Sequence, residues 1–348
     1  MRKFGRAMRI GKTNRSTGSL LHAIALTWLL SSAPAAGSEP SLVLQKSILI
    51  PGVVGRIDHM DYDAAGGRLF VAALGNGSVE VLGVAASSVI ASIRGLTQPQ
   101  GIAFVADARK VYVTTGGSGE LGVYDAASLG LLRRIQLGGD ADNLHYDMAG
   151  RRLFISAGEA IRSLSVQDDV LSPAVALPGH PEGFALSPAQ PLLYANVPVR
   201  GRGVFVIDRN RMSLLSRWPV GGPLANLFSN FPLALDENGR QLFVATRVPS
   251  ALVVMDAGTG TQVATVRIDG DADDVFLDAA RSRLYVSCGD GFIDVISRKN
   301  ADSYALRDRI PTAAGARTSL WVASTDTLYV AAPQRGDLPA RILVFRAR

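Results

Sequence analysis

Cysteine is nearly absent from this chain of 348 residues, since Cys288 is the only one. A single thiol allows no internal disulfide, so the fold must depend on its apolar core, which about 310 residues are enough to build. It also excludes zinc sites made of several cysteines and the cysteine pair that attaches haem. Cys288 directly follows an apolar run at residues 284–287. We expect it to be a packed side chain rather than a nucleophile.

Motifs of common enzyme classes are missing as well. The chain has no G-x-S-x-G elbow, no H-E-x-x-H pair and no Walker or dinucleotide fingerprint. The glycine-rich stretch at residues 116–119 lies between two predicted strands, which is typical of a hairpin turn. No reaction type follows from local motifs.

Long apolar runs are also scarce. The clearest one, residues 20–30, is too short to span a bilayer, which takes roughly 20 residues. Basic residues precede it and small residues at 33–36 follow it. This order predicts a secretory signal peptide over residues 1–36, a single mature domain over residues 37–348, and a periplasmic or secreted location. An uncleaved membrane anchor is the alternative; otherwise we expect no transmembrane segment after leader removal.

The basic excess of the chain resides in this leader. The whole sequence has 36 Lys and Arg against 30 Asp and Glu, a net charge of +6. The leader holds six of the basic residues and no acidic one, so the mature chain is formally neutral. Binding to the phosphates of nucleic acid requires a basic surface. We therefore expect no nucleic-acid partner.

A short strand-like motif recurs along the mature chain. Each copy surrounds one aromatic residue with β-branched and aliphatic residues, and turn pairs such as Asn76-Gly77 separate the runs. The aromatic residues are Phe70, Tyr112, Phe154, Tyr194, Phe243, Tyr285 and Tyr329. They are spaced by 42, 42, 40, 49, 42 and 44 residues. Seven copies at this period predict an all-β, seven-bladed β-propeller with four-stranded blades.

The two ends of the mature chain share one blade in this interpretation. The last repeat offers only three strands, near residues 319–323, 327–332 and 341–346, and a spare strand lies at residues 41–50. Pairing of the spare strand with the last blade closes the ring and removes an exposed sheet edge. We therefore expect the last blade to be closed by the N-terminal strand.

The repeat resembles that of the YVTN-repeat, YncE-like family of bacterial exported propellers. Val111-Tyr112-Val113-Thr114 nearly spells the motif for which that family is named, and the resemblance extends over residues 41–348. It implies a seven-bladed propeller and a periplasmic or secreted location. It implies little about chemistry, because fold does not determine function.

Polar residues gather where each repeat leads into its first strand. The first strand of every blade lines the channel of a propeller, so these residues are expected to ring one channel mouth. One aligned position holds Asp58, Gln100, Asp142, Glu182, Phe231, Asp273 and Arg317. The ligand-binding candidates at this and nearby positions are Asp58, His59, Asp142, Asn143, His180, Glu182, Asn230, Asp273, Asp274 and Arg317. Acids prevail among them, which predicts an acidic mouth.

Carboxylates around one axis repel one another unless a cation, a shared proton or a basic partner offsets their charge. Oxygen ligands suit a divalent cation such as Ca²⁺ or Mg²⁺. The candidate metal ligands are Asp58, Asp142, Glu182 and Asp273. Adding His59 or His180 extends the choice to a transition metal, and Arg317 can neutralise an acid or bind a ligand carboxylate. The alternative is that the acids only satisfy backbone groups in tight turns.

Two further features bear on the mouth. The fifth repeat is longer because residues 223–230 are inserted before its first strand, and this insertion is a candidate lid or pocket wall. His145 lies three residues beyond Asp142, within a first strand, and we expect it to be a packing histidine.

These observations favour a protein that binds a small ligand, a peptide or a partner protein at an acidic channel mouth. A second interpretation is a hydrolase or lyase that uses a divalent metal in the same mouth, similar in architecture to lactone-hydrolysing propellers. A periplasmic metal-handling or redox accessory protein is a third. Chelation separates the first two, because only a metal-dependent enzyme loses activity together with its ion.

Overall fold

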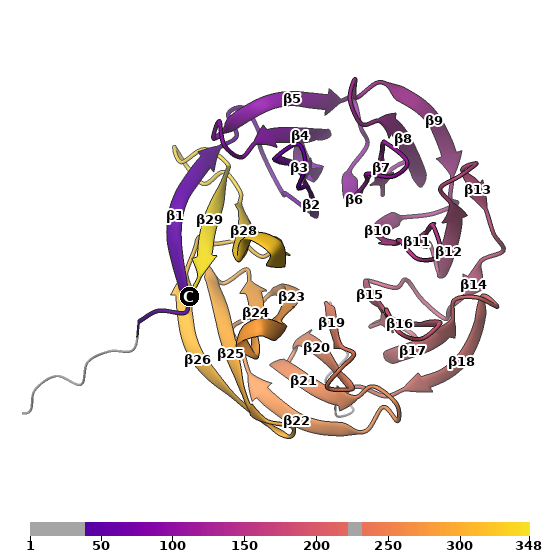
Figure 1. Cartoon of the computed structure of the whole chain (residues 1–348), viewed down its shortest axis with the longest axis vertical. Helices are drawn as coiled ribbons and strands as arrows, with labels where there is room; N and C mark the ends of the chain where they lie inside the picture. The colour runs from indigo at the N-terminus through magenta and orange to yellow at the C-terminus, as the bar shows by residue number, and fades with distance from the viewer. Residues whose placement is uncertain (1–38, 222–231) are drawn as a thin grey trace, which may run out of the picture. The chain divides into compact units, whose positions relative to one another are not determined.

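The computed structural model describes residues 39–221 and 232–348, and residues 40–348 form one compact unit. Seven antiparallel sheets follow one another around a central channel, one for each sequence repeat (Figure 1). The first strand of each blade lies nearest to the channel and the last lies on the outside of the ring (Figure 1). The predicted seven-bladed β-propeller is therefore confirmed.

Each blade is a four-strand meander in chain order, apart from the third and seventh blades. Blade 1 comprises β2 (Met60–Asp63), β3 (Arg68–Ala73), β4 (Ser78–Gly83) and β5 (Ser88–Arg94), and blade 2 comprises β6 (Pro99–Val105), β7 (Lys110–Thr115), β8 (Glu120–Asp125) and β9 (Leu131–Gln136). Blade 3 comprises β10 (Ala141–Asp147), β11 (Arg152–Ala157), β12 (Ala160–Ser165), β13 (Val170–Leu171) and β14 (Val175–Ala176). Blade 4 comprises β15 (Gly183–Leu186), β16 (Leu192–Val197), β17 (Gly203–Asp208) and β18 (Ser213–Trp218). Blade 5 comprises β19 (Leu233–Asp236), β20 (Gln241–Arg247), β21 (Ser250–Asp256) and β22 (Gln262–Arg267). Blade 6 comprises β23 (Ala272–Asp278), β24 (Arg283–Cys288), β25 (Phe292–Asn300) and β26 (Ser303–Pro311). Blade 7 comprises β27 (Ser319–Val322), β28 (Thr327–Ala332), β29 (Arg341–Ala347) and β1 (Leu42–Leu49).

Burial differs between the strands of a blade. The second strands β3, β7 and β24 are buried at every position after the first, because they pack against a neighbouring blade on each face. The outer strand β9 is exposed at five of its six positions, and the first strand β2 is buried only at its two ends. Polar side chains facing the channel therefore come from the first strands and from the loops that precede them.

Blade 3 departs from the four predicted strands. Its outer edge is split into β13 and β14, which both pair with β12. Pro173 lies between these two short strands and has no backbone N–H with which to continue the ladder. The interruption is on the outside of the ring, so it does not disturb the channel.

Blade 7 is closed by the N-terminal strand, as predicted. β1 pairs antiparallel with β29 from Leu42 opposite Ala347 to Leu49 opposite Arg341. Ile48 is fully buried in the core between blades 7 and 1, whereas Leu42 packs in the core between blades 6 and 7. One short strand thus holds three blades together.

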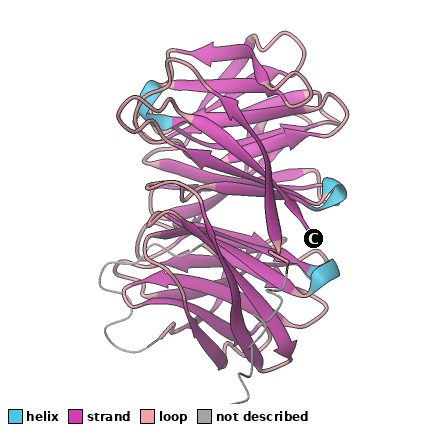
Figure 2. Ribbon diagram, turned by 90° about the vertical axis from the view of Figure 1, so that its left-hand side faces the viewer, coloured by secondary structure: helices cyan, strands magenta, loops and turns pink. Residues whose placement is uncertain are grey.

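Short 3₁₀ turns complete the described chain: η1 (Leu74–Asn76), η2 (Ala279–Arg281) and η3 (Ala323–Thr325). Figure 2 shows these turns among the loops that join the strands. Across residues 39–221 and 232–348, no helix has the length and apolar character that crossing a bilayer requires. Cys288 is buried at the end of β24, as expected for a packed thiol, and burial raises its pKa.

Candidate functional site

The first strands of the blades enclose a cavity of about 360 Å³ in the channel. Its lining includes apolar side chains such as Leu144, Phe184 and Phe276. The predicted binding residues that line it are Asp58, His59, Asp142, Asn143, Glu182, Asp273 and Asp274. His180 and Arg317 contact acids of this set, whereas Asn230 and the inserted segment lie outside the described residues. The repeat alignment therefore brings most of its candidates to one place.

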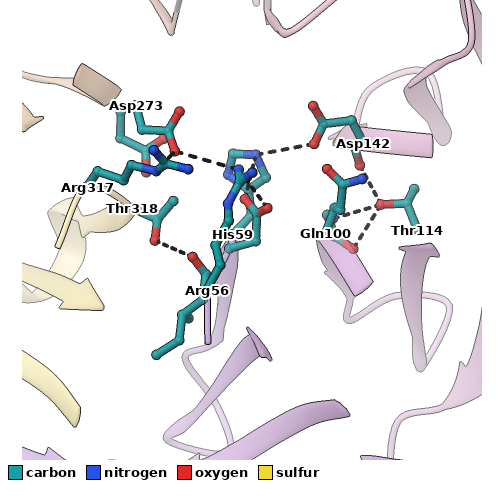
Figure 3. A network of polar contacts seen from close by, with 12 residues as sticks. Arg56, His59, Gln100, Thr114, Asp142, Asp273, Arg317 and Thr318 are labelled. Carbon is teal, nitrogen blue, oxygen red and sulfur yellow. Dashed lines mark hydrogen bonds and ion pairs between the residues drawn. The ribbon is translucent and has the colours of Figure 1, made fainter. Parts of the chain in front are cut away.

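Asp273 is the acid to which several arginines converge. Arg247 Nη2 lies 2.8 Å from Asp273 Oδ1, and Arg317 Nε lies 3.0 Å from Asp273 Oδ2. Arg56 Nη2 is 3.8 Å from the same Oδ2 atom. Figure 3 shows Arg317 and Arg56 directed toward Asp273. These guanidinium groups come from blade 5, from the loop before β27 and from the loop before β2, so the carboxylate ties several blades together.

The same arginines neutralise two further acids of the mouth. Arg247 Nη1 and Arg317 Nη1 lie 3.2 and 3.0 Å from Asp271 Oδ1. Arg56 Nη2 lies 2.9 Å from Asp58 Oδ2. Burial raises the pKa of Asp58, and Arg56 opposes that effect. Basic partners thus allow this half of the acidic ring to remain compact.

Arg247 was missed in the sequence, although the repeat carries a signal for it. It stands at the end of β20, where its Nε also donates to the Ala272 carbonyl at 3.0 Å. The corresponding residues of the other repeats, four positions after the recurring aromatic, are Leu74, Gly116, Gly158, Pro198, Gly289 and Pro333. A lone charged residue among glycine, proline and leucine marks a side chain that reaches a neighbouring blade.

His59 lies near the centre of the mouth, between Asp142 and Asp273 in the view of Figure 3. Its Nε2 atom is 3.7 Å from Asp58 Oδ1 and 3.9 Å from Asp142 Oδ1. Burial acts to lower the pKa of His59, but the surrounding carboxylates, Asp58 first and Asp274 next, outweigh it and raise the pKa. His59 is thus a second basic partner of Asp58, beside Arg56, and it also approaches Asp142.

Asp274 is a buried acid at the boundary of blades 6 and 7. Its Oδ2 atom accepts a hydrogen bond of 2.6 Å from the backbone N–H of Ser319, the first residue of β27. Burial raises the pKa of Asp274 to about 8, with the neighbouring charge of Asp273 adding to it and His59 opposing it. A carboxyl of this kind is largely protonated at neutral pH.

A second group of side chains occupies the opposite part of the mouth. One donor atom from each of Asp142, His180 and Glu182 lies within 4.8 Å of the others, an arrangement able to hold a metal ion. Of the four metal ligands expected from the sequence, Asp142 and Glu182 lie in this group, whereas Asp58 and Asp273 pair with arginines. The structure thus adds His180 to the two carboxylates.

His180 is the nearest basic partner of the carboxylates in this second group. Burial and the nearby Asp142 raise the pKa of Glu182 to about 7. Burial opposes protonation of His180, but its contact with Asp142 and the charge of Glu182 raise its pKa to about 9.

His145 and Asp61 lie deeper in the channel. The His145 ring packs edge-on against Phe184 of the next blade, with ring centroids 4.6 Å apart, in agreement with a packing role. It is in contact with the channel, but enclosure by the ring lowers its pKa to about 4. Asp61 accepts a hydrogen bond of 2.7 Å from the Phe104 N–H, and burial raises its pKa to about 6.

No family model matches the chain, and the comparison with curated proteins gives no match either. Among solved structures, the chain is similar to one of Kuenenia stuttgartiensis hydrazine synthase, with a TM-score of 0.72 at 16% identity over 86% of this chain and 99% of the other. It is also similar to the WD40 repeats of RRP9, with a TM-score of 0.72 at 12% identity over 88% and 98% of the two chains. At these identities the likeness supports the propeller fold alone.

Proposed function

We propose that this protein is an exported, YncE-like propeller that binds a small molecule, or the end of a peptide, at the mouth of its channel. The observation that carries the proposal is the cavity of about 360 Å³, which is lined by a set of convergent charged groups together with apolar side chains such as Leu144, Phe184 and Phe276. Ligand sites are typically concave and largely apolar, with a few polar groups that orient the ligand. The channel cavity provides both kinds of group, with a larger share of polar ones.

The charge of the mouth selects the ligand's polar end. Acidic residues outnumber basic ones along the cavity wall: Asp58, Asp61, Asp142, Glu182, Asp273 and Asp274 face it together with Arg56, His59 and His145. The arginines form ion pairs mainly with Asp58 and Asp273. The side of the mouth formed by Asp142 and Glu182 is therefore the part proposed to bind a ligand. We therefore propose a ligand with a positively charged or hydrogen-bond-donating head and an apolar body.

Binding can be tested with small amines and their carboxylic-acid counterparts on the same carbon skeletons, in buffer containing a chelator. We expect amines to raise the melting temperature of the mature protein, since a ligand that binds only the folded state stabilises it. Asp142→Asn should weaken amine binding about tenfold or more, the cost of one charged hydrogen bond. The measurements are thermal shift followed by titration calorimetry.

Glu159→Gln is the matched control, because Glu159 is exposed outside the cavity and pairs with Arg200. It should leave amine binding unchanged. If no compound binds, or if Asp142→Asn binds as well as the wild type, the mouth is not the binding site.

Export is proposed on the leader alone. Residues 1–36 have the order of segments found in secretory signal peptides, and they lie outside the described residues. We expect intact-mass analysis of the protein from a bacterial periplasmic fraction to give a chain that starts near residue 37. A chain that keeps residues 1–36 and remains with the membranes contradicts this prediction.

A metal-dependent hydrolase or lyase is the second candidate. The observation that favours it is the group formed by Asp142, His180 and Glu182, because three protein ligands leave a coordination position open for water or substrate. A metal bound there would polarise a substrate carbonyl or activate water at the polar end of the cavity.

A further inference from the structure

The group formed by Asp142, His180 and Glu182 joins two neighbouring blades. Asp142 lies on β10 of blade 3, and His180 and Glu182 lie in the loop that precedes β15 of blade 4. Asp142 and Glu182 line the channel cavity. Backbone contacts fix both sides: the Glu182 N–H donates to the Asn196 carbonyl at 3.0 Å, and the Asp142 carbonyl accepts from Thr114 Oγ1. Backbone hydrogen bonds thus tie Asp142 and the loop residue Glu182 to neighbouring strands.

The imidazole of His180 is oriented by a group outside this set. Its Nδ1 atom lies 2.8 Å from the Gly158 carbonyl, which can only accept, so Nδ1 carries the hydrogen. When a metal ion displaces the second ring proton, the lone pair lies on Nε2, the atom that faces Asp142. Histidines that bind metals commonly use one nitrogen for the metal and the other for such a hydrogen bond.

The spacing of the donor atoms fits an ion better than a direct hydrogen bond. His180 Nε2 is 3.6 Å from Asp142 Oδ2, beyond normal hydrogen-bond length. Two ligands bound at about 2.1 Å to one tetrahedral ion lie about 3.4 Å apart. The remaining donor-atom separations are all within 4.8 Å.

The acids of this group also differ from those on the other side of the mouth. Asp58 and Asp273 are neutralised by Arg56, Arg247 and Arg317 at 2.8 to 3.0 Å. The ion pairs of Asp142 run to imidazoles, at 3.6 and 3.9 Å. Asp142 is only 8% exposed, and burial of a carboxylate favours a close cationic partner.

We infer that Asp142, His180 and Glu182 bind one divalent first-row transition-metal ion, such as Zn²⁺, at the channel mouth. The inference deepens the proposed function, on which it rests, by naming the cation that this part of the mouth selects. An imidazole donor favours such an ion over Ca²⁺ or Mg²⁺, which prefer oxygen ligands alone. The remaining coordination position would take water or the lone pair of a ligand donor atom, such as an amine that has lost its proton.

The test uses the mature protein, residues 37–348, stripped of metal with a chelator and then titrated with Zn²⁺ by calorimetry. We expect one Zn²⁺ to bind per chain in the presence of millimolar Mg²⁺ or Ca²⁺. His180→Gln and Glu182→Gln should each weaken Zn²⁺ binding at least about tenfold, since each removes one of three ligands. Co²⁺ bound to the wild type should show visible absorption bands of a site with nitrogen and oxygen ligands, and His180→Gln should lose them.

Glu159→Gln again serves as the control, because it removes an exposed carboxylate next to Gly158 without touching the three ligands. It should bind Zn²⁺ as the wild type does. Absence of Zn²⁺ binding by the folded wild type, or equal binding by Glu182→Gln, overturns the inference even if His180→Gln fails to fold. Amine binding without Zn²⁺ binding leaves the proposed function standing and removes only the metal site, whereas absence of both removes both.

Discussion

A chain that lacks strand β1, starting at residue 51, should lose cooperative folding. Deletion removes three buried apolar residues, Leu42, Ile48 and Ile50, and each buried side chain of this size contributes about 1.5–3 kcal/mol. Their sum is comparable to the net stability of a domain, about 5–15 kcal/mol. It also exposes the edge of β29 to other chains. Circular dichroism and size-exclusion chromatography of residues 37–348 and 51–348 measure the effect.

Point variants of the same strand give a graded version of this experiment. Ile48→Ala should lower the free energy of unfolding by about 2–5 kcal/mol, because it leaves a cavity in a closed core. Leu44→Ala is the control: Leu44 is 51% exposed on the same strand, and its loss should cost less than about 1 kcal/mol. Equal costs for both variants, or a cooperative melt of the truncated chain at the wild-type temperature, contradict closure of the ring by β1.

The second large effect is expected from Asp274→Asn and depends on pH. The pKa of Asp274 is raised from 3.8 to about 8 by burial, so the folded state holds this proton more tightly than the unfolded state. The wild type therefore loses stability as pH rises from about 4 to about 8, and the loss is complete above that range. Asn keeps an oxygen that accepts from the Ser319 N–H but cannot ionise.

The free energy of unfolding of Asp274→Asn, relative to wild type, should increase by about 2 kcal/mol between pH 5 and pH 8. This is less than the full linkage of about 1.36 kcal/mol for each pH unit over that interval. Denaturant unfolding at pH 5, 6.5 and 8 with a chelator present measures it. Asp302→Asn, an exposed position on the same blade, should shift stability little and equally at each pH. A difference between Asp274→Asn and wild type that does not change with pH argues against a buried, protonated Asp274.

The propeller could be predicted from the sequence because its information is periodic. The aromatic residues from Phe70 to Tyr329 recur in strands that the structure places second in each blade, the most buried position. A fixed spacing then aligns every other feature of the blades, including the loops before the first strands. The same spacing led from Asp58 to Asp142 and Asp273, and all three line the cavity.

The ion pairs within the mouth could not be predicted from the repeat spacing. Alignment gives the height of a residue along the channel but does not show which long side chain reaches across to the next blade. Asp58 and Asp273 looked like metal ligands equal to Asp142, yet Arg56 and Arg247 approach them in the folded ring. His180 stands two positions before Glu182, and its donor atom reaches Asp142 only because blades 3 and 4 are adjacent.

Closure by β1 also sets the order in which the ring is completed. The first strand of the propeller, β1, pairs with β29, so Leu42 meets Ala347 only after all seven blades have been synthesised. Blades 1 to 6 each contain their own consecutive strands and can form as the chain grows, whereas blade 7 also needs β29. Pairing across such a sequence separation is slow, because the entropy of closing the loop opposes it. Until then the edges of β1 and β29 stay unpaired, and this is the interval in which the growing chain is most open to aggregation or to a chaperone.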